Sequence, residues 1–453
     1  MSIVGLYSAY SALQAAQAGL DTTSHNVANA GTDGYTRQRV ELQARRPYAS
    51  PNGPIGTGVD VADIARARDR FADQRVWLHA EANGRFSAKA DLLAAMDEVT
   101  MEPDGGVSVA LADLWTSFEQ LALDPTDQAA RIEVLGSLEG VALRVRELAT
   151  NWNAKLDEAR SELGSVVDEV DRLLGEVARL NVEILDVGTA GSPNDLLDTR
   201  DRLLDRLTEL AGVTVTDGPS GTVRVSLDGL SLVDGANVHT LSVGPGDTVV
   251  HAAGVSLTPG GRLAGLTEFL TVDAPAVLAS LDAFAVDLAT AVNTTHAAGY
   301  APSGAAGGPL FSYTPGDAAA TFSVAISDPR DLAAAQDPGP PVPAFDGRNA
   351  QALADLRDQP VALGGTTTID GAFRRVVTEL AGRTRRTRDG VETTGRLLDS
   401  SRALRESRRG VSLDEEMANL LQYQRSYEAA ARVMTAVDQL LDTLVNRTGI
   451  VGR

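Results

Sequence analysis

The chain begins with apolar residues that recur every seven positions, which is the repeat of a helix packing along a narrow seam. The stripe is narrower than the face that a helix presents to a broad core, so it favours helix–helix packing. The residues that follow it in sequence offer no matching apolar face. Its members are Leu6, Leu13, Leu20 and Val27, with Ile3 and Tyr10 on the same seam.

The pattern changes over residues 35–66, where loose alternation flanks the Pro- and Gly-rich stretch RRPYASPNGPIGTG. Alternation around turn residues predicts a two-stranded excursion with a long loop. Helical periodicity then returns over 68–211. Its longest stripe, Ile132 to Ile184, exceeds an ordinary helix and predicts one or two extended rods. Asn194 is expected to cap the helix after it.

Strand character replaces helical character over residues 213–261, with a turn signal at DGPSG. A helix is expected over about 263–297, and the Ala-, Gly- and Pro-rich residues 298–345 hold one expected strand, FSVAI. The chain from about 346 is helical again. Apolar positions of the last helix are spaced by threes and fours: Leu413, Met417, Leu420, Tyr427, Met434, Val437, Leu441 and Leu444.

These patterns predict a mainly α fold with small β parts. The terminal stripes are expected to pack on each other as a coiled coil, although an ordinary intramolecular bundle remains an alternative. The seam buries little apolar surface for the chain that it must order, so we expect a marginal pair in the monomer that further copies make firm.

Three parts follow from this pattern. We expect a terminal helical coiled-coil domain from residues 1–34 and 412–453. An elongated helical-bundle domain is expected from 35–212, 262–299 and 346–411, with its short β excursion at 35–66. An inserted, small β-rich outer part is expected from 213–261 and 300–345.

Charge and composition narrow the function classes. The net charge is −21, from 40 basic and 61 acidic residues, which disfavours nucleic acid or an anionic membrane as a partner. The chain has no cysteine, which excludes disulfides, thiolate nucleophiles and Cys-ligated zinc. Residues 1–20 contain no Lys or Arg and so lack the cationic start of a cleaved signal peptide. We find no 18-residue apolar stretch, and so expect no membrane span.

Candidate chemistry is sparse. Four aspartates at 195–205 suggest a divalent cation, but arginines interleave with them, and Asp198 with Arg202 is a plain i,i+4 pair. The five histidines have no metal-binding spacing, and no nucleophile or phosphate-loop motif occurs. The basic run at 385–388 is interpreted as a solvated helix face. We therefore predict no catalytic residue, no cofactor and no metal site.

The stretch SHNVANAGTDGYTRQ, residues 24–38, has two compatible interpretations. Asn26, Asn29 and Thr32 can be helix-stop residues, with Gly34 at positive φ. They can equally belong to an assembly interface, because a defined helix stop would aim Tyr35 at a neighbouring subunit.

Residues 11–39, which contain this stretch, resemble the N-terminal signature of the axial proteins of the bacterial flagellum. That signature is shared by rod, hook and junction proteins, so it indicates the superfamily only. Its core lies at Asn26, Ala28, Asn29, Thr32, Gly34 and Tyr35.

Further segments resemble one family within it, the hook-associated protein 1 family of hook–filament junction proteins. They occur in family order over nearly the whole chain. These are residues 54–75, 115–135, 192–207 with NDLLDTRD, 291–311, and 411–434 with SLDEEMANLLQYQ.

The resemblance implies a structural adaptor of the flagellum that assembles axially at the hook–filament junction. Implied partners are copies of the chain in a ring, the hook protein, the second hook–filament junction protein and an export chaperone on the C-terminal helix. Implied location is extracellular, after export by the flagellar type III apparatus without a cleaved signal peptide. The expected assembly interface is Leu6, Tyr10, Leu13, Leu20, Asn26, Val27, Asn29, Thr32, Gly34, Tyr35, Leu413, Met417, Leu420, Tyr423, Tyr427, Met434, Leu441 and Leu444.

Three alternatives remain at this point. Another axial subunit, such as a hook, rod or flagellin-like protein, would share the N-terminal signature. A secreted coiled-coil effector or adhesin would need a recognition domain, for which 213–345 is the candidate. A cell-wall hydrolase would need paired acidic or nucleophilic residues, which the sequence does not show.

Overall fold

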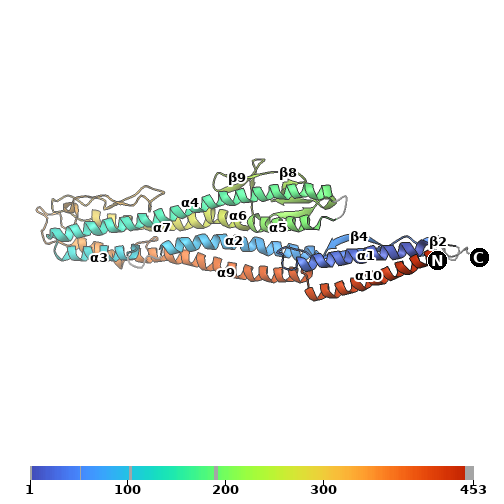
Figure 1. Ribbon diagram of the computed structural model, residues 1–453. Helices are drawn as coiled ribbons and strands as arrows, with labels where there is room; N and C mark the ends of the chain where they lie inside the picture. Colours follow the sequence, from blue (N-terminus) through green and yellow to red (C-terminus); the bar gives the residue numbers. More distant parts are fainter. Residues whose placement is uncertain (1–2, 51–52, 101–104, 188–191, 444–453) are drawn as a thin grey trace, which may run out of the picture.

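The computed structural model describes residues 3–50, 53–100, 105–187 and 192–443. The molecule is a long rod, and the first and last helices lie side by side at one end of it (Figure 1). Helix accounts for 64% of the described residues and strand for 14%, which confirms a mainly α fold with small β parts.

The terminal helices are α1 (Ile3–Ala28) and α10 (Leu413–Asp442), which pack against each other along their length (Figure 1). The other side of α1 contacts a hairpin of β1 (Gln38–Ala44) and β4 (Val59–Arg66), which pair antiparallel. Short strands β2 (Tyr48–Ser50) and β3 (Gly53–Ile55) pair within the connecting loop. The predicted two-stranded excursion is therefore present, and it covers α1.

The rest of the rod, which we call the body, is a helical bundle. Helix α4 (Gln128–Val187) is one unbroken helix of 60 residues, which settles the choice between one and two rods. Helix α2 (Arg70–Thr100) packs along α9 (Ile369–Arg409), and α3 packs on α4. The remaining helices are α3 (Val107–Leu123), α5 (Asn194–Ala211), α6 (Gly261–Glu268), α7 (Ala274–Ala297) and α8 (Arg348–Ala354).

The core of the body contains large aromatic side chains, including Trp115, Phe118 and Trp152, which are fully buried. Each buried indole N–H keeps a hydrogen-bond partner, as burial of a polar group requires. Trp115 donates to Asp370, and Trp152 donates to Thr100 over 3.1 Å. The body is therefore a well-filled core in its own right.

Two small sheets lie against α4 (Figure 1). Their strand orders are β5-β6-β7-β8 and β11-β10-β9. The β-rich character expected over 300–345 is largely wrong, because only β12 (Phe311–Ser312) and β13 (Ser323–Val324) form there and the remainder is mostly loop. The strands of the two sheets are β5 (Thr214–Asp217), β6 (Val223–Leu227), β7 (Leu230–Asp234), β8 (Asn237–Val238), β9 (Leu241–Gly244), β10 (Thr248–His251) and β11 (Ser256–Leu257).

The helix expected over 263–297 contains a π-turn, η2 (Phe269–Asp273), between α6 and α7. Among the described residues, this continuous segment, Gly261–Ala297, is apolar and long enough to cross a membrane by length and composition alone. The prediction that the chain contains no apolar stretch of this length is therefore wrong. Core helices of soluble bundles meet the same criterion, and α7 packs on α9 and α8.

Candidate functional site: the terminal helix pair and its elbow

The seven-residue stripe of α1 lies at the edge of the contact with α10. Leu6, Leu13, Leu20 and Val27 are each only partly buried, and Tyr10 is about half exposed. The fully buried positions of α1 are instead small or polar: Ala9, Ser11, Ala15, Ala16, Gly19, Thr22, Thr23 and Asn26. The side chains of the expected leucine seam are thus only partly buried within the monomer.

Gly19 explains why small residues form the contact. A Cβ atom at Gly19 would lie 2.5 Å from the ring of Tyr423, which is closer than real atoms approach. Gly58 meets the other side of α1 in the same way, because its Cβ would lie 2.1 Å from Ser11 Oγ. The helix is therefore held closely between α10 and the hairpin by its small residues.

Helix α10 exposes much of its apolar surface. Only Glu416, Ala430 and Val437 are buried along its 30 residues. The predicted residues Leu420, Tyr423, Met434 and Leu441 are partly buried on the α1 side, while Leu413, Met417 and Tyr427 are exposed. Leu421, Val433 and Leu440 are also exposed, and they lie outside the predicted apolar stripe of the helix. Leu444 lies outside the described residues.

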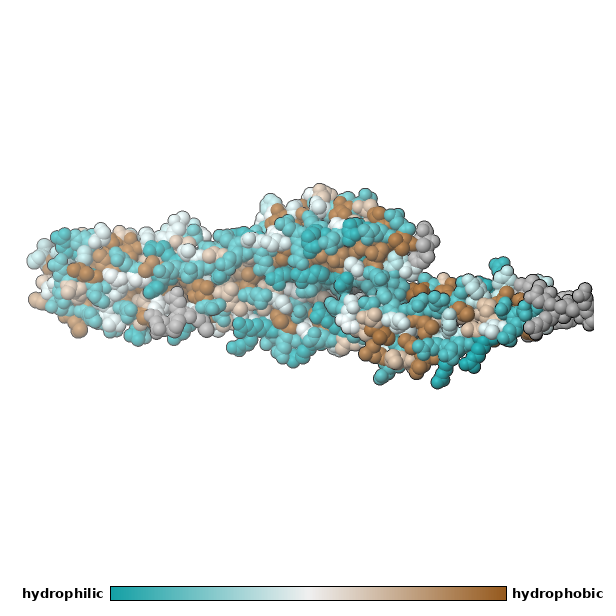
Figure 2. Space-filling model, viewed as in Figure 1, coloured by the Kyte–Doolittle hydropathy of each residue, from teal (hydrophilic) through white to brown (hydrophobic). Residues whose placement is uncertain are grey.

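Figure 2 shows apolar side chains gathered over the α10 side of the terminal pair. Leu413, Met417 and Leu421 follow each other at four-residue spacing on one flank, each about half exposed. An apolar flank of this kind without a partner in its own chain is characteristic of an interaction surface.

The terminal pair joins the body through a polar cluster that we call the elbow, formed by residues 26–38, 66–73, 194–205 and 405–416. Asn26 is at its centre and is buried. Its Nδ2 donates to Gln38 O (2.9 Å) and Glu416 Oε2 (3.0 Å), and its Oδ1 accepts from Tyr35 Oη (2.8 Å) and Gln38 N (2.9 Å). The whole hydrogen-bonding capacity of this amide is satisfied, so it links α1, the hairpin and α10.

Arg37 extends this link to the start of α10. Its Nη1 pairs with Glu415 (2.5 Å) and its Nη2 with Glu416 (2.6 Å). Its backbone N–H donates to Arg409 O, at the end of α9. Burial, together with the charges of nearby carboxylates including Glu416, raises the pKa of the Tyr35 phenol well above its usual value. Tyr35 therefore remains a neutral donor to Asn26.

The other signature residues close the end of α1. Asn29 Nδ2 donates to His25 O, and Thr32 Oγ1 donates to Asn29 Oδ1. Gly34 has φ +77°, as expected, and a Cβ there would meet Arg202 of α5. The helix-stop interpretation is therefore correct for these residues, while their role in assembly remains a prediction.

Three of the four aspartates of α5, Asp198, Asp201 and Asp205, pair with arginines of other elements. Arg66 Nη1 lies 2.6 Å from Asp198 and 2.9 Å from Asp201, all three largely buried. Asp198 also accepts from Thr36 N. Asn194 does not cap its helix, because Pro193 holds the N-cap position and Asn194 Nδ2 donates to Ile64 O instead. The NDLLDTRD motif thus meets the N-terminal signature in space.

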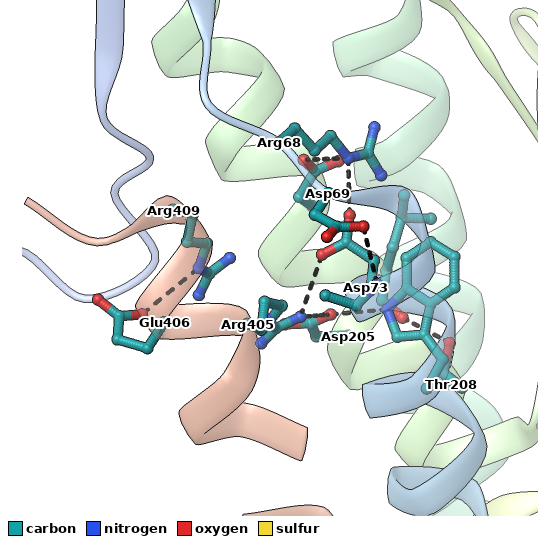
Figure 3. A network of polar contacts seen from close by, with 12 residues as sticks. Arg68, Asp69, Asp73, Asp205, Thr208, Arg405, Glu406 and Arg409 are labelled. Carbon is teal, nitrogen blue, oxygen red and sulfur yellow. Dashed lines mark hydrogen bonds and ion pairs between the residues drawn. The ribbon is translucent and has the colours of Figure 1, made fainter. Parts of the chain in front are cut away.

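Figure 3 shows the part of the elbow between the end of α9 and the neighbouring helices. Arg405 forms a two-pronged pair with Asp205, with both N–O distances at 2.8 Å, and Asp205 also accepts from Trp77. Arg68 pairs with Asp73 over 2.8 Å. Burial raises the pKa of Asp73 despite Arg68. These ion pairs fix the ends of α2, α5 and α9 relative to one another.

Comparison with known proteins gives three family matches in chain order. Residues 6–36 match the model described as flagella basal body rod protein. Residues 93–311 match the flagellar hook-associated protein FlgK helical domain. Residues 407–447 match the flagellar basal body rod FlgEFG protein C-terminal model. The two rod-type matches cover the terminal pair, and the FlgK match covers much of the body.

A flagellar hook-associated protein 1 from Bacillus subtilis is 32% identical over all of this chain and 99% of its own length. The chain belongs to the hook-associated protein 1 family. A member from Escherichia coli is 24% identical over 97% of this chain and 98% of its own. The chain is accordingly a structural protein of the flagellar hook–filament junction.

A solved structure described as the flagellar hook junction protein FlgK from Burkholderia pseudomallei has the same fold. It superimposes with a TM-score of 0.67 at 17% identity, covering 75% of this chain and all of that one. The two chains therefore share one fold over three quarters of this chain.

Proposed function

We propose that this chain joins hook to filament by axial self-assembly, with the terminal helix pair as its main contact surface. The observation that carries the proposal is the surface of that pair. The apolar stripe of α1 is only partly buried in the monomer, and the exposed flank of α10 has no partner among the described residues. Neighbouring copies that add helices to this pair would bury both surfaces.

The proposed partners are copies of the chain in a ring, the hook protein on one side and the second hook–filament junction protein on the other. An export chaperone is the fourth partner, bound to α10 before assembly. Support for that contact is the exposed stripe Leu413, Met417 and Leu421, because an amphipathic helix is recognised through its apolar face.

The proposed site of action is extracellular, in the flagellum, after passage through the flagellar type III apparatus without a cleaved signal peptide. The proposed task is structural, with no catalysis, cofactor, nucleic acid or membrane involved. Support comes from the relatives, which are structural flagellar proteins, and from the net charge of −21. Within the described ranges, no group of three His, Asp or Glu residues is placed to hold a metal.

Deletion of the gene in its host tests the adaptor role. We expect hooks without filaments by electron microscopy and flagellin released to the medium, both reversed by the intact gene. Normal filaments after deletion would refute the junction assignment. Cells without hooks would instead place the chain among rod or hook subunits.

Complementation with Leu413→Asp combined with Met417→Asp tests the proposed surface. Two charges on the exposed flank would oppose its burial in an assembly and against the chaperone, so we expect loss of filaments. The matched control is Leu78→Asp, which is equally exposed but on α2 in the body. Equal loss of filaments in the control would remove the special role of the terminal pair.

A further inference from the structure

Helix α9 carries a stripe of arginine and leucine that the chain leaves uncovered. Arg386, Leu397, Leu404 and Arg408 are separated by 11, 7 and 4 residues, which places them on one side of the helix. We call them the α9 stripe. Leu397 is 46% exposed and Leu404 is 36% exposed. Both arginines are exposed, and neither forms an ion pair with any residue that the structure describes.

The charge of α9 is opposite to that of the chain. The helix has eleven arginines and six carboxylates, so its formal charge is 11 − 6 = +5, in a molecule of charge −21. Arginine is enriched at protein interfaces, where its fork and its apolar stem both make contact. A basic stripe with two exposed leucines is therefore better suited to an acidic, partly apolar surface than to water.

The body of the same molecule offers such a surface near its other end. A groove of about 810 Å³ runs between α3 and α4. Gly136 and Gly140 line it, with open space where their side chains would be. Exposed Val109 and Ile132 supply apolar contact area. Figure 2 shows apolar patches among polar ones over this end of the rod.

The rim of this α3–α4 groove is acidic. Asp113 and Glu133 line it, and neither has an ion-pair partner in the described part of the chain. Residues 105–140 hold six carboxylates, all of them exposed. The single basic residue of that stretch, Arg131, is buried and donates to Pro125 O and Leu332 O. Arg144 also lines the groove, but it pairs with Glu147 over 2.8 Å, and Glu119 lies 4.0 Å from Arg357. Asp113 and Glu133 therefore carry the unpaired charge of the rim.

We propose that the α9 stripe of one copy docks in the α3–α4 groove of a neighbouring copy. Leu397 and Leu404 lie over the two glycines, and the arginines of the stripe face the carboxylates of the rim. This inference rests on the proposed self-assembly and adds a second contact between copies, in the body. Opposite charges on the two surfaces offset the mutual repulsion of two chains of charge −21 and fix which face meets which.

The two surfaces are different, so the contact is heterologous rather than symmetric. They also lie at different heights along the rod, because the groove is formed by the first part of α4 and the stripe by the last part of α9 (Figure 1). Neighbouring copies joined this way are displaced along the axis of the assembly. Such a contact closes into a ring or continues as a helix, according to its rotation.

Disulfide cross-linking tests the contact without disulfides from natural cysteines, because the natural chain has none. One copy carries Ser137→Cys in the groove, and a second, co-expressed copy carries Ser400→Cys between Leu397 and Leu404. Flagella isolated from these cells are oxidised and the dimer is measured. The matched control replaces Ser137→Cys by Ser165→Cys, an exposed position further along α4. We expect dimer from the first pair and none from the control.

Charge reversal tests the recognition itself. Arg386→Glu with Arg408→Glu in the Ser400→Cys copy should abolish the dimer, and adding Asp113→Arg with Glu133→Arg to the Ser137→Cys copy should restore it. If both single-cysteine chains are found in the flagella without dimer, this proposal fails and the proposed function stands. Dimer that persists unchanged after reversal also overturns it. Absence of the unmodified chain from the flagella would overturn the proposed function as well.

Discussion

The body and the terminal pair are built on different principles although both are helical. In α4, 22 of 60 residues are buried, and they include Trp152. In α10, 3 of 30 are buried, and one of these is Glu416. The body has a core that excludes water, whereas the pair is joined by small residues along its length and by hydrogen bonds and ion pairs at its elbow.

The stability of the monomer therefore resides mainly in the body. Stability within a protein is local and follows buried apolar contacts. The body should therefore melt as a cooperative unit, and the pair should open at a lower cost while the body stays folded. Assembly would then supply to the pair the apolar burial that the body already has.

The largest expected effect comes from emptying the core of the body. Trp152→Ala should lower the free energy of unfolding by about 3–5 kcal/mol, through lost burial and the cavity left behind. Met417→Ala, on the exposed flank of α10, should stay within about 0.5 kcal/mol. Denaturant unfolding followed by circular dichroism measures both. A comparable cost for Met417→Ala would contradict the comparison.

The next effect comes from the elbow. Asn26→Ala removes the hydrogen bonds to Tyr35 Oη, to the backbone N–H and C=O of Gln38 and to Glu416 Oε2, at about 1–3 kcal/mol for each group that stays unsatisfied. Hydrogen exchange should show faster opening of α10 with the body unchanged. Asn29→Ala is the control, since Asn29 bonds only within the end of α1. Equal protection of α10 in the two variants would remove Asn26 from its central role.

A smaller effect concerns the close approach of α1 and α10. Gly19→Ala must displace the ring of Tyr423, which we expect to cost about 1–3 kcal/mol, more than the helix propensity gained. Gly5→Ala has open space around its new methyl group and should stabilise the same helix. Limited proteolysis of the pair should therefore change in opposite directions for the two variants. If both variants changed the rate of proteolysis in the same direction, the contact between Gly19 and Tyr423 would not be close.

The smallest effect depends on pH and belongs to the body alone. His296 is buried between the carbonyl of Gly308 and the N–H of Ala333, and burial lowers its pKa. Its neutral form stabilises the fold above pH about 6.5, and this contribution is lost as pH falls from there toward the lowered value. His296→Gln should flatten the decline of the melting temperature between pH 7 and pH 5. An unchanged decline in the His296→Gln variant would contradict this role of His296.

Periodic elements were predictable from the sequence because their signal is local. The long stripe from Ile132 to Ile184 is one helix, and the alternation over 35–66 is a hairpin. The pairing of the two terminal stripes was also predicted, although the leucines of α1 lie at the edge of the contact. Glycine and alanine carry no amphipathic signal, so the close packing at Gly19 was not foreseeable.

The elbow could not be predicted, because it joins residues that are far apart in sequence. Asn26 and Glu416 are separated by 390 positions, and Arg405 and Asp205 by 200. Asn194 was expected to cap a helix and instead bonds the hairpin, since tertiary contact overrode its local preference. The acidic first turn of α10 was the one available signal, and it did not identify Arg37 as the partner.

The uninterrupted length of α4 makes the molecule a lever with its pivot at the elbow. Sixty residues of helix extend about 90 Å, so a tilt of about 10° at one end displaces the other by about 15 Å. Rearrangement of a few side chains around Asn26 and Arg37 is therefore magnified at the far tip. In an adaptor that joins two different lattices, a small tilt at the elbow can therefore move the far tip to the position that either lattice requires, without any bend in the rod itself.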